Sequence, residues 1–349
     1  IAKKTPEGIN RIFYTICGST AVETAIKIAI AYHRAKGDSK RFRFVGRERG
    51  YHGMNIGATT VGGMINNVKT FASVLMPGVQ HMRHTHLPEH KFVKGQPETG
   101  VELAEDLERI AMNFGGENIA ACIVEPIAGS TGTLVPPKGY LKRLREICDK
   151  HGILLIFDEV ITGWGRTGSA FAAQEWGVTP DIMTMAKATT NGVVPMGVVA
   201  VKEEMYDAVL DASKAPEGTP ELFHGYTYSG IPVAVAAALA VQDIFDKEDI
   251  FKRAKEMSPY FQDGLHSLKD LKEVVSIRGY GMMGGVEMKM DEKPGKSGYQ
   301  TFKHCYDAGV NFKNTGDTLI IAPQFICEKK HIDEIIDKLR TGISNYTKS

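Results

Sequence analysis

The sequence lacks features that would point to a membrane, a nucleic acid or an extracellular protein. No apolar run reaches the ~18 residues of a membrane-spanning helix, and the longest candidate is interrupted by Gln242 and Asp243. The net charge of +1 gives no electrostatic basis for binding nucleic acid or an anionic membrane. The five cysteines are odd in number and lack metal-site spacing, which favours reduced thiols in a cytoplasmic protein.

The N-terminus lacks both an initial Met and the pattern of a signal peptide. Because the first expected strand begins by about residue 11, we expect an opening segment to be absent from this sequence. With 349 residues and about 150 residues per domain, the chain has room for two domains. The composition becomes more charged beyond Asp246, so we predict domains over residues 1–240 and 241–349. Within the second domain, residues 274–288 predict one glycine-rich strand.

Two chemically useful side chains follow two apolar stretches of strand length. Residues 153–157 lead into Asp158, and residues 182–186 lead into Lys187. Because ligands of open α/β sheets bind at the carboxyl ends of strands, we expect the acid and the amine to meet at one edge. A lysine amine can condense with the aldehyde of pyridoxal phosphate (PLP), and a carboxylate can hold its pyridine nitrogen protonated. The pair therefore predicts a PLP site.

A phosphate site is predicted near the N-terminus. Residues 11–17 are β-branched and aromatic, as in a strand, and Gly18 and Ser19 interrupt them. Thr20 and Glu23 have the spacing of a capping box, which predicts a helix from this point. A glycine turn before a capped helix offers free backbone N–H groups to a phosphate. A plain strand–helix turn is the alternative.

A glycine-rich loop supports a competing hypothesis. Residues 163–168 match the Gly-x-Gly-x-x-Gly pattern of dinucleotide-binding sites and follow a predicted strand. However, Asp158 and Glu159 lie between the strand and the glycines, where they would repel a pyrophosphate. A nucleotide-binding dehydrogenase therefore stays a distant alternative.

Four histidines raise the question of a metal site. His81, His84, His86 and His90 lie close together, but their spacing suits no compact zinc site and no cysteine is near. We expect a loop at a subunit interface here and no metal.

Together these motifs resemble those of the class III (fold type I) PLP-dependent aminotransferases. Within that class the chain looks most similar to the ω-amino acid:pyruvate (β-alanine:pyruvate) aminotransferases. The resemblance extends from about residue 10 to the end of the chain. It is carried by residues 46–53, 135–143, 157–163, 191–197 and 224–229.

The resemblance implies a fold and a set of cofactor contacts. The fold would be α/β, with a large domain built on a mainly parallel seven-stranded sheet and a smaller C-terminal α/β domain. Lys187 and Asp158 would be catalytic. The other implied cofactor-binding residues are Gly18, Ser19 and Thr20 at the phosphate, Tyr51 and Val160 on opposite ring faces, His52 and Glu125 nearby, and Thr227 of a partner subunit.

Two departures from the family pattern bear on ligand binding. Cys17 stands where the phosphate loop often has serine, which removes one hydroxyl donor. Lys313 stands where the family has a mobile arginine that binds substrate carboxylates, so we expect Lys313 and Tyr51 to contact substrate. Lysine keeps the charge but loses the planar fork of arginine, which raises taurine as an amine donor alongside β-alanine.

The predicted reaction moves an amino group from an ω-amino acid to pyruvate, giving a semialdehyde and alanine by a ping-pong mechanism. A PLP-dependent aminomutase or decarboxylase is the second hypothesis, because the motifs define the cofactor but not the fate of the carbanion. A non-catalytic relative is disfavoured by the presence of both Lys187 and Asp158. The expected partners are an amine donor, a keto acid and a second subunit, in a homodimer or a dimer of dimers with shared sites.

Overall fold

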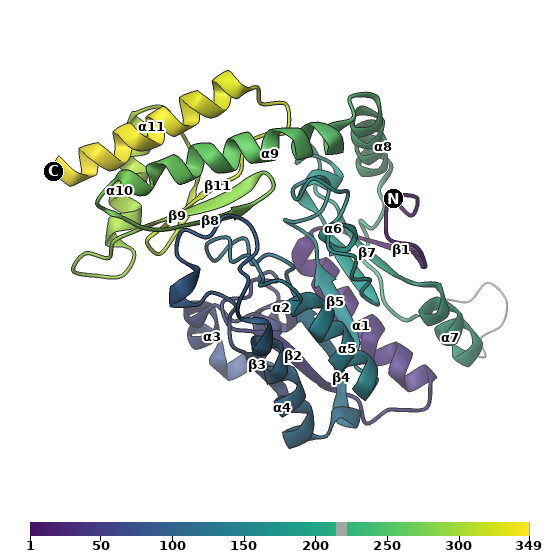
Figure 1. Ribbon diagram of the computed structural model, residues 1–349. Coiled ribbons are helices and arrows are strands. Elements are labelled where there is room, and N and C mark those ends of the chain that lie inside the picture. Colours follow the sequence, from purple (N-terminus) through teal and green to yellow (C-terminus); the bar gives the residue numbers. More distant parts are fainter. Residues whose placement is uncertain (214–221, 349) are drawn as a thin grey trace.

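Two β-sheets organise the protein (Figure 1). The computed structural model describes residues 1–213 and 222–348. The first sheet has seven strands in the order β1-β7-β6-β5-β4-β2-β3. These strands are β1 (Ile9–Thr15), β2 (Arg43–Arg47), β3 (Val79–Met82), β4 (Ile119–Val124), β5 (Leu154–Asp158), β6 (Ile182–Met185) and β7 (Gly197–Lys202).

The predicted mainly parallel sheet is confirmed. The pairs between β6, β5, β4, β2 and β3 are parallel, whereas β7 runs antiparallel to both β1 and β6. Along β5, Leu155 and Phe157 belong to one apolar cluster, and Leu154 and Ile156 belong to the other. This alternation shows that both faces of the sheet are covered, which explains the continuous apolar run.

Helices cover the two faces of this sheet (Figure 1). Helix α1 packs in the cluster that contains Ile156, and α4 and α5 pack in the cluster that contains Phe157. The helices are α1 (Gly18–Ala35), α2 (Ile56–Val61), α3 (Ile65–Thr70), α4 (Glu105–Phe114), α5 (Tyr140–His151), α6 (Ala172–Glu175), α7 (Glu203–Ser213) and α8 (Pro232–Lys247). No helix in the described part of the chain is long and apolar enough to cross a membrane.

The second sheet is antiparallel and has the order β10-β11-β9-β8. It shares an apolar cluster with three helices of the C-terminal part. Its elements are α9 (Ile250–His266), β8 (Val274–Tyr280), β9 (Met283–Met288), α10 (Lys296–Asp307), β10 (Lys313–Thr315), β11 (Thr318–Ile321) and α11 (Lys329–Lys348). Residue 240 lies within α8, and the division into domains after it stays a prediction.

One local prediction in the C-terminal part is wrong. Residues 274–288 suggest a single glycine-rich strand, but they form the hairpin of β8 and β9. The chain turns at Gly281, which has a φ of +58°, and a Cβ there would lie 2.3 Å from the carbonyl oxygen of Arg166. Only glycine combines this backbone conformation with so close an approach.

The predicted capping box at Thr20 and Glu23 is also wrong. Helix α1 begins two residues earlier, with Cys17 at the N-cap. The hydroxyl group of Thr20 accepts a hydrogen bond from the Cys17 backbone N–H at 2.9 Å, and Glu23 instead accepts one from the Ala58 N–H at 3.0 Å. The Thr20 hydroxyl group therefore bonds to Cys17 and the Glu23 carboxylate bonds to α2, so this pair does not cap a helix that begins at Thr20.

The histidine-rich segment is partly a strand rather than a loop. His81 lies in β3, and its Nε2 atom is 2.8 Å from the carbonyl oxygen of Gly62. Among the residues that the structure describes, no group of three or more His, Cys, Asp or Glu side chains could hold a metal ion.

Candidate active site

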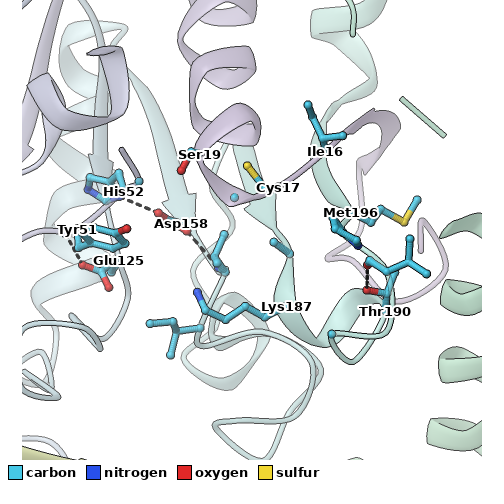
Figure 2. Close-up of a pocket in the computed structure, with 18 residues that line it drawn as sticks. Ile16, Cys17, Ser19, Tyr51, His52, Glu125, Asp158, Lys187, Thr190 and Met196 are labelled. Carbon is cyan, nitrogen blue, oxygen red and sulfur yellow. Dashed lines mark hydrogen bonds and ion pairs between the residues drawn. The ribbon is translucent and has the colours of Figure 1, made fainter. Parts of the chain in front are cut away.

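A cavity of about 280 Å³ opens at the carboxyl ends of β5 and β6, beside the first turn of α1. Figure 2 shows Asp158 at the end of β5 and Lys187 just after β6 lining it, with His52, Tyr51 and Glu125 on one side and Cys17 and Ser19 on another. The sequence-predicted residues that line it are Gly18, Ser19, Tyr51, His52, Glu125, Asp158, Val160 and Lys187.

The acid of the site, Asp158, is buried and held by two hydrogen bonds. Its Oδ2 atom lies 2.8 Å from Nδ1 of His52, and its Oδ1 atom accepts a hydrogen bond from the Val160 N–H at 3.1 Å. Because a carboxylate only accepts hydrogen bonds, Nδ1 of His52 carries the proton in this contact. His52 therefore orients the carboxylate.

The amine of the site, Lys187, leaves β6 in an uncommon backbone conformation. Its φ is +44°, a left-handed value that side chains other than glycine rarely adopt. The following turn is held by Thr189, whose hydroxyl group donates to the Ala186 carbonyl oxygen and accepts from Nε1 of Trp164, both at 3.0 Å. The buried turn thus holds the strained residue where its side chain enters the cavity.

The protein around the Lys187 amine shifts its pKa. Desolvation by the surrounding atoms lowers the pKa of Lys187, and the charges of Asp158 and Glu125 oppose this shift. The lowered pKa increases the share of neutral amine, which is the form that attacks a carbonyl group or takes up a proton.

Helix α1 directs its N-terminus at the opposite end of the cavity, through Gly18 and Ser19. The first backbone N–H groups of a helix have no partners within it, and together with the helix dipole they attract an anion. A Cβ at Gly53 would lie 2.7 Å from Cα of Ser19, and one at Gly197 would lie 2.3 Å from the Cys17 carbonyl oxygen. These two glycines let neighbouring chain segments approach the anion end closely.

Two predicted cofactor residues do not line this cavity. The Thr20 hydroxyl group is bonded to Cys17, as described above. Thr227 is exposed, although its neighbour Tyr226 donates from its hydroxyl group to the Thr20 carbonyl oxygen at 3.3 Å. The 224–229 segment therefore lies beside the start of α1, with Thr227 available to another molecule.

Glu125 positions the segment that carries Tyr51. Its two carboxylate oxygens accept hydrogen bonds from the backbone N–H groups of Tyr51 at 2.9 Å and Gly129 at 3.0 Å. Burial raises the pKa of Glu125. The Tyr51 ring in turn lies under the Lys313 ammonium group, which is 5.8 Å from the ring centroid.

A second cavity of about 270 Å³ adjoins the first and shares Val160, Ile161 and Lys187 with it. Lys313 lines this second cavity, so one chamber extends from Lys187 to Lys313. Sequence reasoning missed several lining residues, including Thr190, Val194 and Met196 after Lys187 and Arg166 in the second cavity. The Asn-Gly turn after Lys187 was the signal that could have found the first three.

The glycine-rich loop over residues 163–168 does not form a dinucleotide site. Trp164 is almost completely buried, and Arg166 donates to the carbonyl oxygens of Met282 at 2.8 Å and Pro323 at 2.7 Å. The next helix is α6, which has only four residues and starts at Ala172. The loop thus contacts the second sheet rather than presenting a helix N-terminus to a pyrophosphate.

The donor set fits PLP at each of its functional groups. The N-terminus of α1 suits the phosphate, Asp158 suits a protonated ring nitrogen, and Lys187 suits the aldehyde. The cavity is flanked by Tyr51 and Val160, an aromatic and an apolar side chain of the kind that contacts a planar ring. Fold and site together define a PLP-dependent enzyme of fold type I.

Comparison with known proteins identifies the family. The family model described as aminotransferase class-III matches residues 1–343, so the chain belongs to the class-III aminotransferases, which use PLP. It is 51% identical over 344 residues to an omega-aminotransferase of Caulobacter vibrioides, covering 97% of this chain and 77% of that protein. It is 43% identical over 346 residues to a beta-alanine–pyruvate aminotransferase of Pseudomonas aeruginosa, covering 99% and 77%.

A solved structure agrees with this assignment. The omega transaminase of Pseudomonas jessenii in complex with PMP superposes with a TM-score of 0.93 at 29% identity, covering 99% of this chain and 78% of that chain. The predicted family, fold type and cofactor are confirmed, and the chain is an aminotransferase. The comparisons give no support to the mutase, decarboxylase or dehydrogenase hypotheses.

The close packing at Gly53 predicts a loss of PLP affinity in Gly53→Ala. The added methyl group would displace the α1 N-terminus, so the dissociation constant of PLP should rise about tenfold or more, equivalent to about 1.4 kcal/mol. An absorbance titration of the PLP-free protein measures it. Gly177→Ala is the control, because Gly177 also has a positive φ but no atoms within 4 Å of the added Cβ. Equal effects of both substitutions would contradict this explanation.

Proposed function

We propose that this aminotransferase transfers the amino group of an ω-amino acid or related amine, of the β-alanine or taurine type, to pyruvate. The observation that carries the proposal is the chamber between Lys187 and Lys313, since it offers an amine at one end and a cation at the other. A substrate with an amino group at one end and an anion at the other matches this chamber. The printed names of two relatives, an omega-aminotransferase and a beta-alanine–pyruvate aminotransferase, agree with it.

Each of the active-site residues has a separate role in the proposed reaction. PLP, when bound, supplies an aldehyde that accepts the amino group and a ring that delocalises electrons. Lys187 moves a proton to and from the carbon that carries the amino group, for which a lowered amine pKa is suited. Asp158 would hold the ring nitrogen, and His52 orients the carboxylate that would do so. Gly18 and Ser19 would bind the phosphate through the N-terminus of α1.

The proposed reaction predicts ping-pong kinetics. The amine donor must leave as a semialdehyde before pyruvate enters the same site and departs as alanine. Double-reciprocal plots of alanine formation, with β-alanine or taurine varied at several pyruvate concentrations, should therefore be parallel. Intersecting plots would contradict the scheme.

The substitution Asp158→Asn should lower kcat by about two orders of magnitude or more, since it removes the charge opposite the ring nitrogen.

We assign Lys313 to the distal anion of the substrate. Its ammonium group lies over the Tyr51 ring, which keeps it at the boundary of the chamber shared with Lys187. An ammonium group binds any anion as a point charge, whereas the fork of arginine prefers planar carboxylates. This difference supports sulfonates such as taurine as substrates beside carboxylates.

Substitutions at Lys313 should show whether the charge of its side chain or its shape determines which substrates bind. Lys313→Met should raise the KM for β-alanine about tenfold or more, because it removes a charged hydrogen-bond donor. Propylamine, an amine without a distal anion, should be affected much less. Lys313→Arg keeps the charge and should shift the ratio of kcat/KM values from taurine toward β-alanine. An equal loss for propylamine and β-alanine would contradict anion binding by Lys313.

We also propose a homodimer, or a dimer of dimers, in which each subunit completes the other's site through Thr227. Three apolar side chains of α8, Val233, Leu239 and Ile244, are exposed although this helix buries Ala234 and Ala238 on its other side. Phe223 and Tyr228, which flank Thr227, are 90% and 64% exposed. Such exposed apolar side chains near the site support the proposal that a second subunit packs against this surface.

Subunit mixing tests the shared site. In a hybrid of Lys187→Ala and Thr227→Glu subunits, one site has Lys187 from one chain and Thr227 from the other, while the second site has both defects. Each parent should be nearly inactive, and random exchange should restore about a quarter of wild-type activity in a C2 dimer. A mixture of the double variant with Lys187→Ala is the control. No recovery in the hybrids would mean that Thr227 serves its own subunit.

The five cysteines are all free thiols. A cytoplasmic location, predicted from the cysteine pattern, agrees with free thiols and remains part of this proposal.

A further inference from the structure

Another, much smaller cavity lies on the other side of the segment that carries Tyr51 and His52. Residues 51–53 line both this cavity and the active site, so they form the wall between them. Helix α2 and the start of α3 close the remaining sides. Its volume is about 10 Å³, close to the roughly 10–15 Å³ that a single water molecule requires.

Two of the residues that line this small cavity each carry a buried polar atom without a protein partner. These atoms are Nε2 of His52 and the hydroxyl oxygen of Thr59, whose side chains belong to residues only 3% and 4% exposed. Within residues 1–213 and 222–348, neither atom has a hydrogen bond. Buried polar groups are almost always satisfied, and two unpaired groups on one water-sized space call for a polar molecule between them.

The chemistry of His52 defines what that molecule must do. Because Nδ1 donates to Asp158, the other ring nitrogen, Nε2, is left to accept a hydrogen bond and needs a donor. The Thr59 hydroxyl group can donate to an oxygen atom but has no backbone carbonyl partner in the structure. A water molecule can accept from Thr59 and donate to Nε2 at the same time, which an ion or an apolar ligand cannot.

We propose that this cavity is a built site for one water molecule that bridges Thr59 and His52. Through this bridge Thr59 is a positioning residue for the carboxylate of Asp158. The hydrogen bonds run in one direction, from Thr59 to the water, from the water to Nε2, and from Nδ1 to Oδ2 of Asp158. No bond forms or breaks along this chain. The bridge keeps the imidazole ring oriented so that Asp158 faces the cofactor ring, and this last step rests on the proposed function.

The neighbouring residues support a site specific to Thr59. Thr60, the next residue of α2, already donates from its hydroxyl group to the Ile56 carbonyl oxygen at 2.6 Å and accepts from the Met76 N–H at 3.0 Å. A Cβ at Gly50 would lie 3.4 Å from Nε2 of His52. The glycine therefore leaves room beside the imidazole nitrogen that a side chain would restrict.

The test uses the PLP-loaded protein and three variants. Thr59→Val removes the hydroxyl group at nearly constant volume, Thr59→Ser retains it, and Thr60→Val is a matched substitution on the same helix outside the cavity. The first readout is a high-resolution crystal structure. The second is the ¹⁵N NMR signal of the His52 Nδ1–H group in histidine-labelled protein, assigned with His52→Asn. The third is the kinetics of transamination.

We expect wild-type and Thr59→Ser crystals to show solvent density within hydrogen-bond distance of both Nε2 and the hydroxyl oxygen. Thr59→Val should lose this density, and its His52 Nδ1–H signal should broaden through solvent exchange. Its kcat should fall about tenfold, as for other groups that orient a functional histidine, with KM changed less than twofold. Thr60→Val should leave the NMR signal and kcat near wild-type values.

Three results would overturn the inference: a dry cavity in the wild-type crystal, a Thr59→Val protein with unchanged NMR signal and kcat, or equal effects of Thr60→Val. If Thr59→Val fails to fold, the solvent density in the wild-type crystal and the His52 NMR signal of Thr59→Ser still show whether the bridging water is present. A dry cavity in an active transaminase would refute only the water bridge. Absence of transamination in the wild-type protein would refute the proposed function and leave the crystallographic result standing.

Discussion

The parallel pairing of β5 with β6 is the constraint on which the active site depends. Asp158 is in register with Thr184, and Lys187 follows three residues after Thr184. The Glu159 N–H donates to the Thr184 carbonyl oxygen at 2.9 Å, which extends the contact past the end of β5. The acid and the amine therefore come from buried, rigid elements, as a site with fixed geometry requires.

Charge is distributed along the site in an order that matches an amino-group transfer. The N-terminus of α1 attracts an anion at one end, and Lys313 presents a cation at the other. Between them, Asp158 and Glu125 surround the lysine whose pKa is lowered by desolvation. The net charge of the chain is nearly neutral, but both ends of the site attract anions and two acidic side chains lie between them. This local arrangement would orient the small zwitterionic substrate that we propose.

Much of this arrangement could be predicted from sequence because it depends on local signals. The apolar run before Asp158 and the one before Lys187 identified two covered strands, and strands of this kind bring their carboxyl ends together. The start of α1 was misplaced because cysteine is not a usual N-cap residue, and Thr20 turns back to satisfy it. The β8–β9 hairpin was missed because its turn is flanked by Tyr280 and Met282 instead of typical turn residues.

Contacts between distant parts of the chain could not be predicted from local sequence patterns. His52 and Asp158 are 106 residues apart, and only the strand order brings them to 2.8 Å. The approach of Lys313 to Tyr51 depends on how the second sheet packs against the first, which no periodicity encodes. The family resemblance pointed to Lys313 and Tyr51 as site residues, whereas their relative position is known only from the fold.

Lys187 and Asp158 together form the PLP-dependent transaminase site on which the proposed function depends. The most direct measurement is the visible absorption spectrum of the purified protein with PLP, before and after β-alanine or taurine and then pyruvate, with Lys187→Ala in parallel. We expect a yellow band that bleaches with the amine, returns with pyruvate, and does not form normally in Lys187→Ala. A protein that stays colourless with added PLP, or a band unchanged by both substrates, would contradict this expectation.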